Sequence, residues 1–221
     1  MTIQETALAA HARLAVLVEG LTDAQVAEPS ALPGWTRGHV LAHIAGVTAG
    51  MARQAEHEGS KVEVYPGGQA ARDAAIEEGA GRSAEEHRAA IAASVDRLAG
   101  AWAGVRDWDA PVWYRDGVLA DTVHAVWREV EIHARDLALG PVEWSPEFCD
   151  HTIGFLAARV PGGVRLVLTG GGREWVLGEG EEFRLAGSPA DLTAWLAGRE
   201  PEGEVVGVGP ELGPWPSAAA R

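Results

Sequence analysis

The sequence predicts a chain of two parts: an all-helical domain over residues 1–140, then a small α+β domain over residues 141–221. Three observations favour this division. Apolar residues recur at helical spacing through the first part. Gly140-Pro141 is a strong stop for the last long helix. Short strand-like runs separated by glycines follow that stop.

The expected helices of the first domain begin at recognisable caps. Thr36 is a good N-cap for a helix over 37–57. Ser83 and Glu86 form a capping box for a helix that ends near residue 103. Further helices are expected over 4–19, 23–27, 69–79 and 120–138.

The second domain shows strand signals between two Ser-Pro helix starts. Ser145-Pro146 and Ser188-Pro189 each place a cap residue before a proline in the first turn. Between the two helices, strands are expected over 164–169, 173–177 and 182–185, with Gly170–Gly172 as a hairpin turn. The second helix is expected over 189–198, and the tail from about residue 200 is expected to be irregular.

Charge and composition exclude several classes of function. The chain carries 32 acidic and 18 basic residues, a net charge of −14, and its single lysine is Lys61. Nucleic-acid binding needs clustered lysine and arginine, which this sequence lacks, and an anionic membrane surface is disfavoured for the same reason. With no basic leader and no apolar run near the ~20 residues of a membrane span, we expect a cytoplasmic protein. The oligomeric state stays open.

Two helices carry candidate metal ligands. Glu129 and His133 are four residues apart and share one face of the helix over 120–138, among apolar neighbours. His43 lies in an apolar stretch of the helix over 37–57, and His39 lies one turn earlier. Two histidines and a carboxylate suit zinc, and also iron, manganese or nickel. From spacing alone, a buried hydrogen-bonded polar pair is the competing interpretation.

Other chemistry-bearing residues are expected to be structural. Glu131 falls on another face of its helix and is expected in solvent. The only cysteine, Cys149, rules out an intramolecular disulfide and a cysteine-based zinc site, and is expected to be a buried thiol. Four histidines in polar or alanine-rich surroundings are expected at the surface: His11, His57, His87 and His151.

Two motifs resemble a known family. The segments Leu32-Pro-Gly-Trp-Thr-Arg-Gly-His-Val-Leu-Ala-His43 and Arg128–Leu137 are similar to the mycothiol-dependent maleylpyruvate isomerase family, within the DinB-like metalloenzyme superfamily. Gly187–Arg199 resembles the end of that family's sterol-carrier-like C-terminal domain. The resemblance implies a DinB-like four-helix bundle with a metal triad of His43, Glu129 and His133, with His39 as the fallback ligand.

The resemblance also implies the cosubstrate and a role for arginine. The thiol would be mycothiol and the divalent metal, by preference, zinc. Where the family often carries an arginine one turn before the triad glutamate, this chain has Val126, so Arg128 is the remaining catalytic candidate. An arginine from the second domain is also implied, and the sequence leaves three candidates open: Arg165, Arg173 and Arg184.

Three functions follow from this reading. The first is a metal-activated thiolate adding reversibly to an unsaturated diacid, which isomerises it from cis to trans. The second keeps the same site but releases a stable conjugate, as a mycothiol S-transferase. The third is a metal- or ligand-binding module without turnover. A shared fold does not choose among them.

Overall fold

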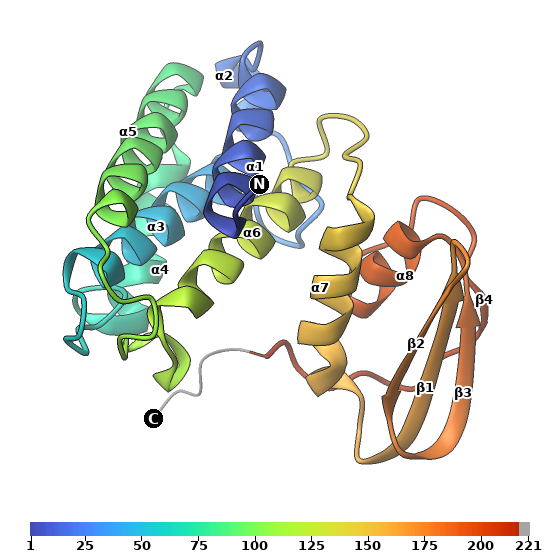
Figure 1. Ribbon diagram of the computed structural model, residues 1–221. Coiled ribbons are helices and arrows are strands. Elements are labelled where there is room, and N and C mark those ends of the chain that lie inside the picture. The colour runs from blue at the N-terminus through green and yellow to red at the C-terminus, as the bar shows by residue number, and fades with distance from the viewer. Residues whose placement is uncertain (217–221) are drawn as a thin grey trace. The chain divides into compact units, whose positions relative to one another are not determined.

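The computed structural model describes residues 1–216, and the chain divides into two compact units, Met1–Val142 and Glu143–Arg221. The first unit is mostly helical and the second carries a mixed four-stranded sheet, as the sequence predicts (Figure 1). Residues 217–221, the end of the expected second domain, lie outside the described residues. Within residues 1–216, no helix combines the length and the hydropathy of a membrane span.

The first unit contains every helix expected there. Thr36 Oγ1 accepts the amide of His39 at 3.4 Å, and Ser83 Oγ accepts the amide of Glu86 at 3.2 Å, so both caps form. The elements are α1 (Ile3–Val18), α2 (Asp23–Val26), α3 (Arg37–Glu56), α4 (Gly68–Ala80), α5 (Ala84–Ala103), the 3-10 turn η1 (Tyr114–Asp116) and α6 (Leu119–Asp136).

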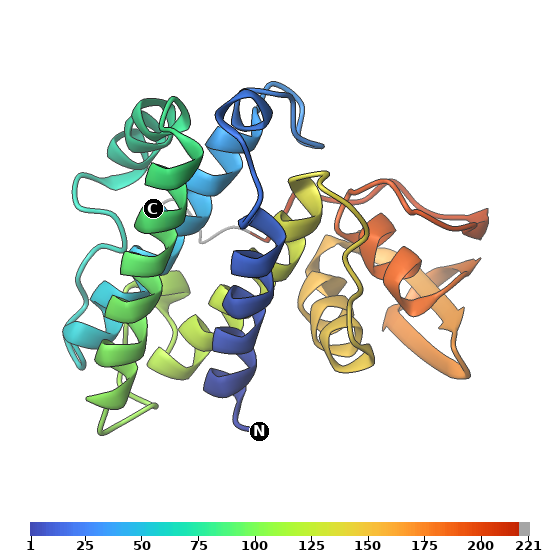
Figure 2. The same ribbon diagram turned by 90° about the horizontal axis from the view of Figure 1, so that it is seen from above.

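Helix α3 is the centre of this unit. It packs against α4, α5 and α6, and α1 packs against α5 and α6 (Figure 1; Figure 2). Glycines bring α4 close to α3: a Cβ on Gly38 would lie 2.1 Å from the carbonyl oxygen of Ala80. One on Gly79 would lie 2.9 Å from Cβ of Ala42. Helix α4 therefore lies directly beside the stretch of α3 that carries His43.

Glu131 does not point into solvent, and that expectation was wrong. The residue is 6% exposed and forms an ion pair with Arg13 of α1. Helix α6 contacts both α3 and α1, so a second face is covered as well as the one that carries Glu129. The periodicity of a single helix shows its most apolar face, but a polar face covered by a charged partner leaves no such signal.

Two of the four histidines expected at the surface are buried. His11 is 2% exposed, and its two ring nitrogens contact the carbonyl of Ala7 at 3.1 Å and the hydroxyl of Thr48 at 3.0 Å. His87 is 1% exposed. Both lie in alanine-rich helices, where the small side chains make the buried and exposed faces look alike. His57 is exposed, as predicted, and His151 is half-buried.

The second unit is a sheet covered by helices. Its elements are α7 (Pro146–Leu156), η2 (Ala157–Arg159), β1 (Gly163–Gly170), β2 (Arg173–Gly178), β3 (Gly180–Ala186), α8 (Pro189–Leu196) and β4 (Val206–Val208). The strand order is β2-β1-β3-β4, with β1 antiparallel to β2 and parallel to β3. Its core includes Ile153, Leu156, Leu166, Leu168 and Leu192.

Three details of this unit can be compared with the predictions. Gly171 and Gly172, at φ +57° and +75°, form the turn between β1 and β2, as expected. Strand β4 differs from the expectation of an irregular tail. It pairs with β3 through its backbone while Val206 and Val208 stay exposed, so it carries no alternating burial pattern. Cys149 is buried, as predicted.

Candidate metal centre

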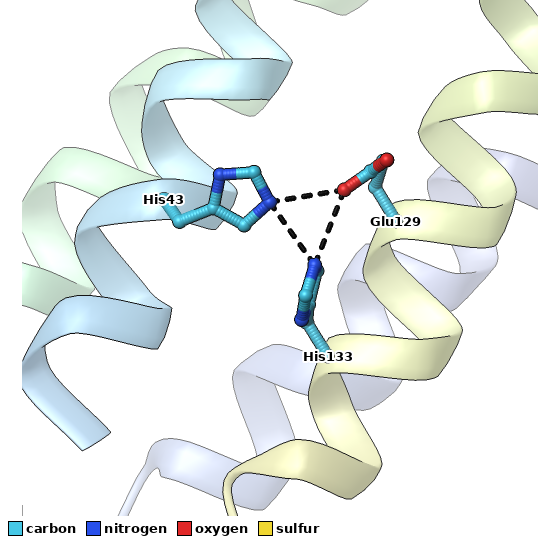
Figure 3. Close-up of side chains that lie close together, drawn as sticks. All are labelled: His43, Glu129 and His133. Carbon is cyan, nitrogen blue, oxygen red and sulfur yellow. Dashed lines mark hydrogen bonds and ion pairs between the residues drawn. The ribbon is translucent and has the colours of Figure 1, made fainter. Parts of the chain in front are cut away.

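The three candidate ligands come together from two helices. Helix α3 supplies His43, and α6 supplies Glu129 and His133 one turn apart (Figure 3). His43 is 6% exposed, and its neighbours Leu41 and Ile44 are fully buried. The apolar packing of α3 against α6 therefore brings the polar ends of these side chains together.

The donor atoms have the spacing of a metal-ligand set. Nε2 of His43 lies 3.0 Å from Oε2 of Glu129 and 3.0 Å from Nε2 of His133, and the last two atoms are 3.2 Å apart. Ligands held at zinc-like bond lengths of about 2.0–2.1 Å in a tetrahedron are about 3.3 Å from each other. A small expansion of the observed triangle would meet that spacing. The residues present thus fit a divalent ion, with three protein ligands as in catalytic zinc sites.

Asp136 orients one of the histidines. Its Oδ2 accepts a hydrogen bond from Nδ1 of His133 at 2.8 Å, and the residue is 0% exposed. A carboxylate on the outer nitrogen fixes the ring so that Nε2 faces the triangle, an arrangement that metal-binding histidines commonly have. His39 is not part of the group: its Nδ1 accepts the amide of Thr36 at 3.1 Å, and its Nε2 lies 3.4 Å from Glu77.

Burial and pairing set the charges of the triad. Burial and the charge of His133 lower the pKa of His43. Burial alone would raise the pKa of Glu129, but hydrogen bonds from His133 and His43 hold it well below its usual value. Burial opposes the charge of His133, yet the hydrogen bonds to Asp136 and Glu129 prevail and raise its pKa to about 9. At neutral pH His43 is therefore neutral, Glu129 ionised and His133 protonated.

Arg72 of α4 borders the triad on the side of His43. Its Nη2 donates to Nδ1 of His43 at 3.1 Å, and its Nη1 donates to Asp73 at 2.8 Å. The guanidinium also lies over the ring of Tyr65, 5.7 Å from the centroid. Burial raises the pKa of Tyr65 to about 12, so its hydroxyl keeps its proton. Trp35 meets the His43 ring edge-on, with centroids 5.8 Å apart.

A second tyrosine and arginine flank Glu129. Tyr114 of η1 shares a hydrogen bond with Arg128, and burial raises the pKa of this phenol. Arg128 is 6% exposed, and burial lowers its pKa while Tyr114 and Glu129 favour its charge. Tyr65 and Tyr114 are the only tyrosines in the chain, and the charge of Glu129 acts on both.

Sequence reasoning did not find Arg72, Tyr65 or Tyr114. They come from a helix, a loop and a 3-10 turn that share no spacing with the triad motifs. The rarity of tyrosine was the one available hint. The second domain was expected to supply one arginine, and all three candidates for it have partners inside their own unit. Arg165 and Arg184 contact Glu182 at 3.2 and 2.8 Å, and Arg173 pairs with Asp150.

A family model and two solved structures that match this chain all name the same enzyme. Residues 7–138 match the family model described as the mycothiol maleylpyruvate isomerase N-terminal domain. A crystal structure of the mycothiol-dependent maleylpyruvate isomerase is similar, with 25% identity and a TM-score of 0.78. That of a histidine-to-alanine variant of the enzyme gives 23% identity and a TM-score of 0.80. Each match covers 96% of this chain and 96% of the other. No curated protein matches the chain.

Proposed function

The chain belongs to the mycothiol-dependent maleylpyruvate isomerase family, and from that premise we propose that it is an enzyme of the same activity. It would convert an unsaturated diacid of the maleylpyruvate type from cis to trans with mycothiol as cosubstrate. The observation that supports this best is the triad, in which three metal-ligand atoms lie 3.0–3.2 Å apart. Two tyrosines with raised pKa values, each hydrogen-bonded to an arginine, interact with its glutamate.

The helical unit would act as a DinB-like metal-binding bundle, and the second unit as a sterol-carrier-like module. His43, Glu129 and His133 would hold zinc, which two imidazoles and a carboxylate suit. A bound zinc ion supplies the chemistry that turns a coordinated thiol into a thiolate, the nucleophilic form, at neutral pH. Asp136 would keep the His133 ring oriented with Nε2 towards the metal.

The reaction itself conserves atoms and electrons. The mycothiol thiolate forms a bond to one carbon of the electron-poor double bond, and the electron pair moves onto the conjugated carbonyl. The former double bond is now single and rotates. The electron pair then returns, the sulfur leaves with its bonding pair, and the double bond forms again in the trans geometry. No oxidant or reductant takes part.

Side chains of the protein would stabilise the negative charge that develops on the conjugated carbonyl in this step. The Tyr65 hydroxyl keeps its proton at neutral pH and can donate to a substrate oxygen. Arg128 hydrogen-bonds to Tyr114 and is affected by the charge of Glu129, so it can hold the Tyr114 hydroxyl beside the triad. We keep Arg128 as a candidate for the reaction in this positioning role.

The test is turnover of maleylpyruvate by the zinc-loaded protein with and without mycothiol, followed by absorbance and product chromatography. Trans product is expected only with mycothiol, and Glu129→Gln should lose most of the rate. Glu77→Gln, an exposed carboxylate on α4, is the matched control and should keep the rate. Turnover that ignores mycothiol would refute the proposal. So would a stable thiol conjugate accumulating in place of the trans diacid.

A further inference from the structure

A cavity of about 380 Å³ adjoins the triad between α3, α4 and α5. His43 forms part of its wall, and so do three arginines, Arg72, Arg82 and Arg97. Most of the remaining lining is alanine and other small apolar side chains, and none of the described lining residues is acidic. In a chain of net charge −14 this is an unusual concentration of positive charge, and the volume suits a small organic anion.

The three arginines are not equivalent. Arg97 is held by Glu56 through two contacts of 2.7 and 2.6 Å, so its charge is already matched. Arg82 is exposed. Arg72 pairs with Asp73 through Nη1, but its Nη2 touches a triad residue, and its side chain is 20% exposed. It therefore lies where a ligand in the cavity would meet the metal centre.

The contact between Arg72 and His43 constrains where His43 carries its hydrogen. Arginine can only donate, so Nδ1 of His43 accepts and Nε2 carries the hydrogen. Metal binding needs the lone pair on Nε2, the atom that faces Glu129 and His133 (Figure 3). A neutral imidazole that coordinates through Nε2 has its hydrogen on Nδ1 and can no longer accept from Arg72. When His43 binds an ion, Nη2 of Arg72 thus needs another acceptor.

We propose that this acceptor is a carboxylate of the substrate, so that Arg72 fixes the diacid in the α3–α4–α5 cavity once the triad holds its metal. A guanidinium pairs with a carboxylate through parallel hydrogen bonds, which fixes orientation as well as position. The assignment rests on the proposed function for the identity of the diacid. It makes Arg72 a specificity-determining residue and gives metal loading a role in substrate binding.

The first test is calorimetric titration with maleate, a cis-dicarboxylate probe, in the zinc-loaded protein. Arg72→Met should weaken maleate binding by about tenfold or more, the scale of a lost charge-assisted hydrogen bond. The matched control is Arg106→Met, which removes the same charge from a side chain that is 89% exposed and outside the cavity. It should bind maleate as the wild type does. Equal maleate affinity in wild type and Arg72→Met overturns the proposal.

The second test needs no substrate. It addresses the exchange in which Arg72 gives up its hydrogen bond to His43 when the metal binds. Zinc affinity is measured by chelator competition in wild type and Arg72→Met. Because zinc must displace the bond from Arg72 to His43, the variant should bind zinc several-fold more tightly. Weaker or unchanged zinc binding contradicts the exchange. Circular dichroism and near one equivalent of zinc in each variant show that the proteins are folded and loaded.

The two proposals fail in different ways. If Arg72→Met loses maleate affinity but the wild type shows no thiol-dependent turnover, the isomerase function falls and the anion site stands. If turnover depends on mycothiol while Arg72→Met keeps both maleate affinity and kcat/KM, the function stands and the role of Arg72 is refuted.

Discussion

A proton competes with the metal at His133, and this gives a quantitative prediction. The pKa of His133 is raised from 6.5 to about 9, so the ring is protonated through neutral pH in the metal-free protein. The pKa values of His43 and Glu129 are lowered, so both are already deprotonated at pH 7. One proton therefore has to leave when the ion binds. With a pKa of about 9, the protonated form is favoured about 100-fold at pH 7.

Zinc affinity should accordingly rise about tenfold between pH 7 and 8, and less steeply as the pH approaches 9. Calorimetry in buffers of different ionisation enthalpy should find about one proton released per zinc at pH 7. Chelator competition gives the affinities at each pH. A flat affinity over this range, or no proton release, would refute the assignment of the charge to His133.

Asp136→Asn tests whether the Asp136 carboxylate causes the raised pKa of His133. Without the carboxylate on Nδ1, the pKa of His133 should fall and the pH dependence above pH 7 should weaken. Zinc affinity near pH 8.5 should drop about 10–100-fold, as for other residues that orient metal-binding histidines. Asp121→Asn is the control on the same helix, since Asp121 accepts the amide of Val118 in the first turn, away from the triad.

Three further predictions test the surroundings of the site. Protonated His133 stabilises the metal-free fold, and this contribution is complete below pH 6.5 because the pKa is raised from 6.5 to about 9. Thermal unfolding without metal should therefore show a stability that falls as the pH rises towards 9, by about 3 kcal/mol at most. Constant stability over this range would contradict the raised pKa. Gly38→Ala should cost about 1–3 kcal/mol in denaturant unfolding because its Cβ would strike the α4 carbonyl, whereas Gly100→Ala, with open space around it, should cost nothing. Tyr114→Phe, which removes the hydroxyl bonded to Arg128, should lower kcat with zinc content unchanged; an unaltered kcat would remove Tyr114 from the reaction.

Much of the fold could be predicted because its signals are local. Thr36, Ser83, Ser145 and Ser188 each cap the helix that follows, and a cap is visible in four consecutive residues. The pairing of Glu129 with His133 is also local, since one helical turn joins them. Joining His43 to that pair required the family resemblance, because no spacing connects residues on separate helices.

The rest depended on contacts between distant segments. Glu131 is buried because Arg13 of α1 reaches it, 118 positions away in the chain. Arg72 reaches His43 because the glycines at the α3–α4 contact let α4 lie close. Strand β4 exists through backbone pairing with β3 alone. None of these leaves a pattern within its own segment.

The placement of the two tyrosines makes the molecule its own spectroscopic probe. Since the chain has no others, selective isotope labelling of tyrosine would give one ring signal from Tyr65 and one from Tyr114, with no background. Both rings are affected by the charge of Glu129, and each bonds a different arginine. Metal binding at the triad and anion binding beside Arg72 would therefore give separate changes in the two tyrosine signals in one solution experiment.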